Sequence, residues 1–263
     1  MLSNHIIWKR RLARVLGGRP PSDRCVIVTY HAVGGGPLSM SAESFREQMT
    51  WLAHNAKPAH LDEVLAAGGA SHGLRVAVTF DDGYENLLSV AAPILHDLGF
   101  AATAYLSTAS IGDGDHIPSR DADGHYPGES FLIWKEVLAL RAMGWTIGSH
   151  AHDHVDLSRQ STAELANQLK RSKATIEDHL GSECWHLAYP WGRHNHVVRA
   201  AAAAAGYRWA VATRHGPLHA AMDPMAVPRI DVRRDYSLED FAAAVRGDWD
   251  YLGLVQSVRS LFA

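Results

Sequence analysis

Short hydrophobic runs alternate along this chain with longer stretches in which apolar residues recur at helical spacing. The clearest run covers residues 76–80 and ends at two adjacent carboxylates, Asp81 and Asp82, followed by Gly83. A near-continuous apolar run of this length is typical of a strand that is buried on both faces. An amphipathic stretch follows at residues 85–98 and predicts a helix, so this part of the chain is interpreted as strand, charged turn and helix.

The same alternation repeats along most of the sequence. Further strands are predicted at residues 25–30, 101–106, 145–148, 185–189, 207–212 and 228–232, and helices at 61–67, 132–143, 161–180 and 196–205, with others starting at Ser41 and Ser237. Strands that alternate with helices at this spacing predict parallel βαβ units, for which an open sheet and a barrel are both compatible. Polar residues directly follow several strands: His31, Asp81, Asp82, His150 and Tyr189. Because strand ends converge at the mouth of a barrel, we predict an α/β fold, an irregular (β/α) barrel of about seven parallel strands.

The chain of 263 residues is divided into three parts by its pattern. Residues 1–22 are predicted to form an N-terminal helix and linker, residues 23–247 the main domain, and residues 248–263 a C-terminal helical tail. Residues 111–128 are rich in Gly, Asp, Pro and His and show no period. This segment is too long for an ordinary connection, and we interpret it as a loop or lid beside a site.

Composition narrows the functional classes. A net charge of −3 and the lack of a basic patch along the main domain argue against nucleic acid as a partner. Two cysteines cannot form a disulfide scaffold, and residues 1–16 lack the apolar core of a signal peptide, so we expect a cytoplasmic protein. The basic, apolar N-terminal helix is expected to dock on its own domain, with peripheral membrane contact as the alternative. The sequence does not indicate an oligomeric state.

The chemistry starts from the adjacent aspartates, which repel one another unless a cation or hydrogen bonds compensate them. Residues 148–157 read GSHAHDHVDL, and in a loop after a strand His150 and His154 can face one point. Together with Asp82 they would form a two-histidine, one-carboxylate metal site, which suits Zn²⁺ and also Co²⁺, Ni²⁺ or Fe²⁺. The alternatives are a helix-capping aspartate beside a solvated one, and a solvated histidine loop.

Three motifs resemble those of the NodB-type polysaccharide deacetylases, carbohydrate esterase family 4. They are TFDDGY at residues 79–84, SHAHDH at 149–154 and AYPWG at 188–192, and the resemblance covers roughly residues 26–232. It implies the NodB-homology fold and a divalent metal, most readily Zn²⁺, held by Asp82, His150 and His154. It also implies that Asp81 is the catalytic base and that the backbone N–H of Tyr189 points toward the oxyanion.

A fourth segment, VTYHAV at residues 28–33, resembles the exopolysaccharide N-deacetylase subgroup. That resemblance implies His31 as the general acid, the alternative being a histidine hydrogen-bonded beside the barrel mouth. Pro190, Trp191 and Arg229 are the predicted substrate-binding residues. Arg229 has two further interpretations, since it could orient Asp81 or form a structural salt bridge.

The sequence departs from the family pattern at Ala151, where Ser or Thr is usual, and at Val155, where Pro is common. Such positions surround the ligands and affect metal affinity or loop rigidity more than the chemistry.

The implied function is metal-dependent removal of an N-acetyl group from an N-acetylated sugar or glycan, such as a lipid-linked or exopolysaccharide precursor. Its products are acetate and a free amine. Two alternatives are hydrolysis of a small cyclic amide at the same site, and a catalytically silent glycan-binding module on the same fold. An inactive module would be expected to have lost Asp81 or a metal ligand, and all of these residues are present.

Overall fold

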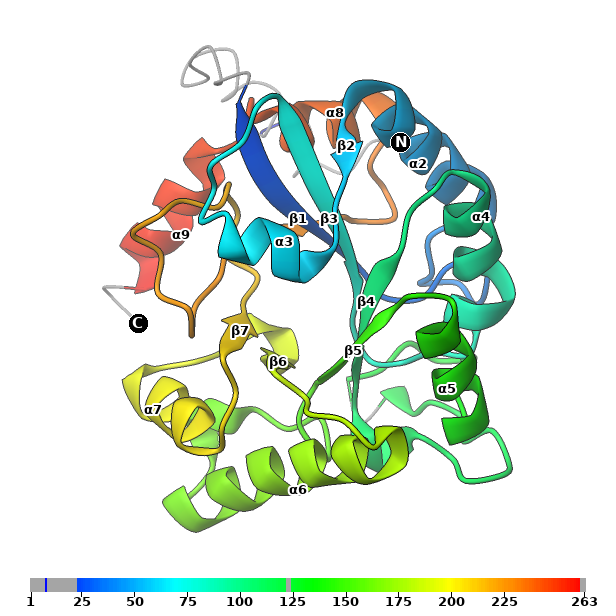
Figure 1. Ribbon diagram of the computed structural model, residues 1–263, viewed down its shortest axis with the longest axis vertical. Helices are drawn as coiled ribbons and strands as arrows, with labels where there is room; N and C mark the ends of the chain where they lie inside the picture. The colour runs from blue at the N-terminus through cyan, green and yellow to red at the C-terminus, as the bar shows by residue number, and fades with distance from the viewer. Residues whose placement is uncertain (1–7, 9–22, 122–123, 261–263) are drawn as a thin grey trace.

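The computed structural model describes residues 8, 23–121 and 124–260, and its centre is one curled parallel sheet (Figure 1). The strands are β1 (Arg24–Tyr30), β2 (Lys57–Pro58), β3 (Leu74–Phe80), β4 (Ala102–Leu106), β5 (Thr146–Ser149), β6 (His186–Ala188), β7 (Trp209–Val211) and β8 (Ile230–Asp231). Seven of them follow one another in the order β7-β6-β5-β4-β3-β1-β8, and β2 pairs with β3 beside this path. Every strand pair is parallel, which confirms the predicted irregular barrel.

The sheet curls around α3 (Leu61–Ala66), which lies among the strand ends in Figure 1. Alternate residues of one strand enter two different cores: Cys25 and Ile27 of β1 pack inside with Leu65 of α3, whereas Val26 and Val28 pack outside against the helices. Every residue of β1, β4 and β6 is buried, on both faces of the sheet. This explains why they appear in the sequence as continuous apolar runs rather than as alternating ones.

The remaining helices are α2 (Ala42–Asn55), α4 (Ala92–Asp97), α5 (Trp134–Ala142), α6 (Thr162–Leu180), α7 (His196–Ala204), α8 (Leu238–Arg246) and α9 (Tyr251–Ser260). The predicted start at residue 161 is confirmed, because the Ser161 hydroxyl accepts the N–H of Glu164 as an N-cap. The helix predicted at residues 85–98 differs: it opens with one π-helical turn, Leu87–Ala91, before α4. Asn86 precedes this turn and accepts the N–H of Val33, which links the turn to the segment after β1.

The predicted N-terminal helix at residues 1–22 lies outside the described residues except for Trp8. In the predicted C-terminal tail, α9 packs against the segment after β7, where the N–H of His215 donates to Gln256 Oε1 at 2.7 Å. The boundaries of the three parts stay a prediction. Among the described residues, no helix has the length and apolarity that crossing a bilayer requires.

Candidate metal centre

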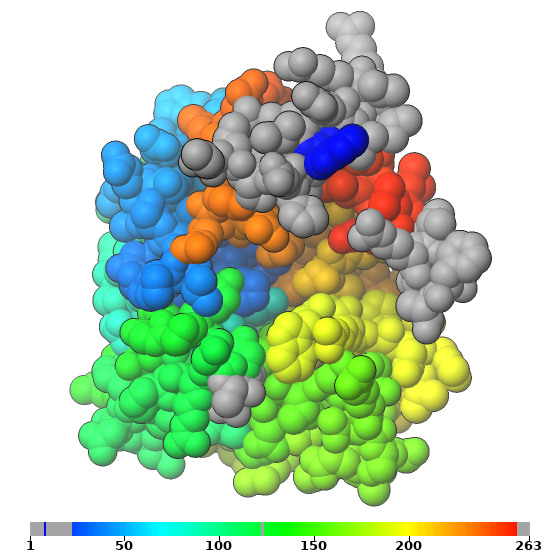
Figure 2. Space-filling view, turned by 180° about the vertical axis from the view of Figure 1, so that it is seen from behind, coloured from blue at the N-terminus to red at the C-terminus, as the bar shows by residue number. Residues whose placement is uncertain are grey.

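The carboxyl-terminal strand ends bring the predicted residues to one mouth of the barrel. Tyr30 and Phe80 are paired in the register of β1 and β3, so His31 and Asp81 leave the sheet side by side. The N–H of His150 donates to the carbonyl of Leu106 at 2.8 Å, which places the end of β5 beside the end of β4. On the face seen in Figure 2, the green segment that follows β4 lies close to the yellow segment that follows β6.

Asp82 lies against both His150 and His154, and all three side chains are buried. Asp82 Oδ1 lies 3.5 Å from His150 Nε2 and 3.4 Å from His154 Nε2, yet it has no hydrogen-bond partner among the described residues. Zinc ligands lie about 2.0–2.2 Å from the ion, and two such ligands in tetrahedral geometry are about 3.4 Å apart. The separations of the carboxylate oxygen from the two imidazole nitrogens therefore fit one metal ion.

The imidazole of His150 is prepared for this role by its surroundings. His150 Nδ1 lies 2.9 Å from the carbonyl oxygen of Ala188, a contact that suits an Nδ1–H donor and leaves the Nε2 lone pair facing Asp82. Burial lowers the pKa of His150 to about 4, against opposing influences that include Asp81 and Asp82. The ring is therefore neutral at pH 7, the form in which histidine binds a metal.

A third histidine, His125, lies at the same place and was not predicted. Ligand atoms of Asp82, His125 and His154 are all within 4.8 Å of one another, a group that does not include His150, and the rings of His125 and His154 stack with centroids 4.4 Å apart. His125 belongs to the segment predicted as a loop beside a site, residues 111–128, but no spacing in the sequence relates it to Asp82, His150 or His154. Its position along the chain was the only available signal.

Asp81 is paired with Arg229. The guanidinium donates to both carboxylate oxygens, at 2.8 and 2.6 Å, and both side chains are enclosed by protein. The same guanidinium donates to the hydroxyls of Thr29 and Thr79 and to the carbonyl of Ala212, so its orientation is over-determined. Burial alone would raise the pKa of Asp81, but the charge of Arg229 holds it well below the ordinary value for a carboxyl group.

This geometry fits both predicted interpretations of Arg229, an orienting contact with Asp81 and a structural salt bridge. The predicted substrate-binding role of Arg229 stays a prediction, and its side chain has no exposed surface.

His31 lies half-buried at the same mouth, and its ring stacks on Tyr126 with centroids 5.4 Å apart. The pKa values of Asp81 and Asp82 are lowered despite burial, and a charge on His31 is among the causes for both carboxyls. His31 is thus close enough to influence them electrostatically. Its role as a general acid stays a prediction.

The turn after β6 differs in one respect from the expectation. The N–H of Tyr189 donates to the carbonyl of Val211 at 3.2 Å, within the pairing of β6 with β7, so it is not directed toward an oxyanion. Pro190 is buried and starts the short 3₁₀ turn Pro190–Gly192. Trp191 is 43% exposed and its ring lies over His154, with centroids 4.4 Å apart.

Backbone strain gathers around these residues. Within the described part of the chain, the non-glycine residues with positive φ are Asp82 (75°), Ala151 (63°), His154 (52°) and Trp191 (53°). Such a conformation costs about 1–3 kcal/mol for each residue and persists where the surroundings over-determine it, most often at functional sites. The fold thus concentrates its strained positions at the strand ends that carry the candidate metal ligands.

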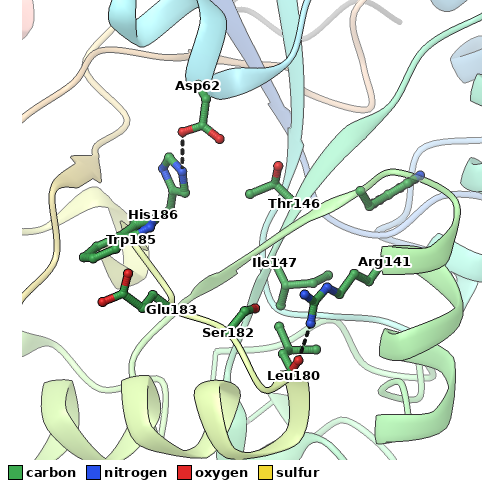
Figure 3. A pocket seen from close by; sticks show the side chains of 10 residues that line it. Asp62, Arg141, Thr146, Ile147, Leu180, Ser182, Glu183, Trp185 and His186 are labelled. Carbon is green, nitrogen blue, oxygen red and sulfur yellow. Dashed lines mark hydrogen bonds and ion pairs between the residues drawn. The ribbon is translucent and has the colours of Figure 1, made fainter.

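A separate hollow of about 180 Å³ lies at the opposite end of the barrel, near the start of β5 and β6 (Figure 3). Its most buried polar side chain is His186, whose Nε2 lies 2.9 Å from Asp62 Oδ1 of α3. Arg141 borders the hollow from the far side and donates to the carbonyl of Leu180. None of the predicted catalytic, metal-binding or substrate-binding residues borders this hollow.

Comparison with known proteins gives consistent findings. The polysaccharide deacetylase family profile matches residues 69–210, more than half of the chain. A putative polysaccharide deacetylase, YxkH of Bacillus subtilis, is 25% identical over 83% of this chain and 75% of its own length. Poly-beta-1,6-N-acetyl-D-glucosamine N-deacetylase of Staphylococcus aureus is 26% identical over 75% of this chain and 69% of its own length.

Two solved structures have a similar fold. IcaB from Ammonifex degensii superposes with a TM-score of 0.73 at 22% identity, covering 85% of this chain and 97% of that protein. The Streptococcus pyogenes deacetylase PplD, solved in complex with acetate, has a TM-score of 0.71 at 23% identity, covering 86% of this chain and 99% of that protein.

Proposed function

The chain belongs to the polysaccharide deacetylase family, and from this premise we propose that it removes the N-acetyl group from an N-acetylated saccharide with a bound divalent metal. The reaction consumes one water and yields acetate and a free amine. One observation carries the proposal: the buried Asp82 Oδ1, which has no hydrogen-bond partner in the described part of the chain, lies near both His150 and His154 at distances that suit a shared ion.

Asp82, His150 and His154 would hold the metal, with Zn²⁺ preferred and Co²⁺, Ni²⁺ or Fe²⁺ also suited to these donors. When bound, a divalent ion there would act as a Lewis acid on the amide carbonyl and favour ionisation of a water molecule.

Asp81 is assigned as the base that accepts the proton of the attacking water. Its low pKa keeps the carboxylate ionised at neutral pH, and the two hydrogen bonds from Arg229 hold it in one orientation. His31, on the neighbouring strand end, is assigned as the acid that donates a proton to the departing amine nitrogen. The C–N bond then breaks with a neutral amine as leaving group, which needs far less energy than an amide anion.

The substrate class is proposed from two features. A curated relative acts on poly-beta-1,6-N-acetyl-D-glucosamine, and the exposed face of Trp191 beside His154 suits the apolar face of a sugar ring. We therefore assign an N-acetylglucosamine-containing exopolysaccharide, or its lipid-linked precursor, as the substrate. The side chain of Pro190 is buried, so Pro190 would contribute by fixing the turn that carries Trp191 rather than by contacting the sugar.

The test is acetate release from β-1,6-linked N-acetylglucosamine oligomers, with added Zn²⁺ or Co²⁺ and after chelation. We expect release that depends on the metal and is lost in Asp81→Asn. Retained oligomer binding without acetate release from any N-acetylated sugar would support a silent glycan-binding module instead. Ring opening of small cyclic amides without acetate release from sugars would support the cyclic-amide alternative.

A further inference from the structure

We propose that His125, carried by the segment between β4 and α5, is a further protein ligand of the metal site. The inference rests on the proposed metal site formed by Asp82, His150 and His154, and extends it by one imidazole that comes from a different part of the chain. The ligand nitrogen of His125 lies within 4.8 Å of a carboxylate oxygen of Asp82 and of a ring nitrogen of His154. Ligands of one ion must be this close before small side-chain rotations bring them into its coordination sphere.

The ring of His125 is held against the site by aromatic neighbours. It is only 4% exposed, stacks on His154, and meets the rings of Phe131 and Tyr84 edge-on at centroid distances of 4.8 and 6.3 Å. Tyr84 follows Asp82 in sequence by two residues, so the same turn positions both the carboxylate and a wall of the His125 pocket. A histidine enclosed in this way has few alternative orientations.

The backbone on either side of His125 is also tied to the site. The N–H of Tyr126 donates to the hydroxyl of Tyr84 at 2.7 Å. On the other side, Gly124 has φ of 78°, and a Cβ placed there would lie 2.5 Å from the indole of Trp191. The backbone at Gly124 therefore packs directly against the indole of Trp191. The segment that carries His125 is thus held on one side by Trp191 and on the other by the hydroxyl of Tyr84.

The donor chemistry agrees with this position. A carboxylate and three imidazoles are all ligands that Zn²⁺ accepts, and with four protein ligands the ion would take up water in the five-coordinate geometry that catalytic zinc can adopt. His125 would increase the affinity for the ion and would cover one side of it. Because His125 belongs to the segment after β4, ion binding and the position of this segment would be coupled.

The test compares His125→Asn with a matched control, His152→Asn. His152 belongs to the same histidine run as the proposed ligands, but its Nδ1 lies 2.9 Å from the Thr108 hydroxyl, which engages the ring away from Asp82. The Kd for Zn²⁺ is measured by competition with a chromophoric chelator, and the coordination of Co²⁺ by its visible absorption spectrum. We expect His125→Asn to weaken Zn²⁺ binding by at least about tenfold and to change the Co²⁺ spectrum, whereas His152→Asn leaves both unchanged.

A merely structural role for His125 gives a different result. It would lower the thermal midpoint of the metal-free protein while leaving the Zn²⁺ affinity and the Co²⁺ spectrum as in the wild type, and that result would overturn the proposal. A tenfold loss of affinity also reduces the stabilisation that saturating Zn²⁺ provides, by about 1.4 kcal/mol. If metal binding depends on His125 but no acetate is released, the proposed reaction is overturned and the ligand role of His125 stands. If the wild-type protein binds no divalent ion, the proposed reaction and the ligand role of His125 are both overturned.

Discussion

Replacing Arg229 by methionine should destabilise the protein by about 3–5 kcal/mol, because it leaves the Asp81 carboxylate buried without its counter-charge. The pair is fully enclosed, and its two N–O distances are 2.8 and 2.6 Å. Two unit charges about 4 Å apart attract by about 4 kcal/mol at an effective dielectric constant of about 20, which is the same size as the expected loss. Domains unfold at a cost of about 5–15 kcal/mol, so the loss is large but measurable by urea denaturation.

Two further variants separate charge from geometry. Arg229→Lys keeps the charge but loses the two-pronged contact, so its stability should lie between those of the wild type and Arg229→Met. Arg24→Met is the matched control, since Arg24 also contacts both oxygens of one carboxylate, on Asp250, at 3.0 Å. The Asp250 side chain is 31% exposed, and solvent screening should make that loss smaller.

The pH dependence gives an independent measure. The pKa of Asp81 is lower in the folded protein than in the unfolded chain, where it is about 3.9. The ion pair with Arg229 therefore stabilises the protein fully at pH values above about 3.9. This stabilisation is lost as the pH falls through the pKa that Asp81 has in the folded protein. In Arg229→Met, burial is opposed only by the weaker influences of His150 and His31, so the pKa of Asp81 rises. The acid limb of the kcat/KM profile should then move to higher pH, with no such change in Arg24→Met. An Arg229→Met protein within about 1 kcal/mol of wild-type stability, or with an unchanged profile, would refute this reasoning.

Three other predictions concern the same mouth of the barrel. Asp82→Ala and His154→Ala should each lose the bound metal, and full metal content in either variant by elemental analysis would contradict the ligand set. His31→Ala should slow amide deacetylation about 10²- to 10⁴-fold and spare 4-nitrophenyl acetate, whose leaving group needs no proton; equal losses on both substrates would remove His31 from the acid role. Gly148→Ala should cost about 1–3 kcal/mol in urea denaturation, because its Cβ would lie 2.6 Å from the Tyr105 ring, and an unchanged midpoint would show that the ring can move.

The strand ends were predictable because burial on both faces leaves a clear trace in the sequence. The apolar runs located the strands, and parallel pairing then required the residues that follow them, such as Asp82 and His150, to meet. His125 was missed because its segment has no period, and its position depends on distant contacts with Phe131 and Trp191. The predicted direction of the Tyr189 N–H also differs from the structure, where this group donates to the carbonyl of Val211. A sequence motif gives the order of the residues, but it does not give the hydrogen-bond partner of each backbone group.

The position of Arg229 has a consequence for the order in which the protein can mature. Asp81 is synthesised long before Arg229, and residues 69–210, which match the family, contain the aspartate but not its partner. A nascent chain that has folded its first strands would therefore carry an uncompensated carboxylate inside the barrel until β8 arrives. Completion of β8 and neutralisation of the Asp81 charge by Arg229 would therefore be a single event.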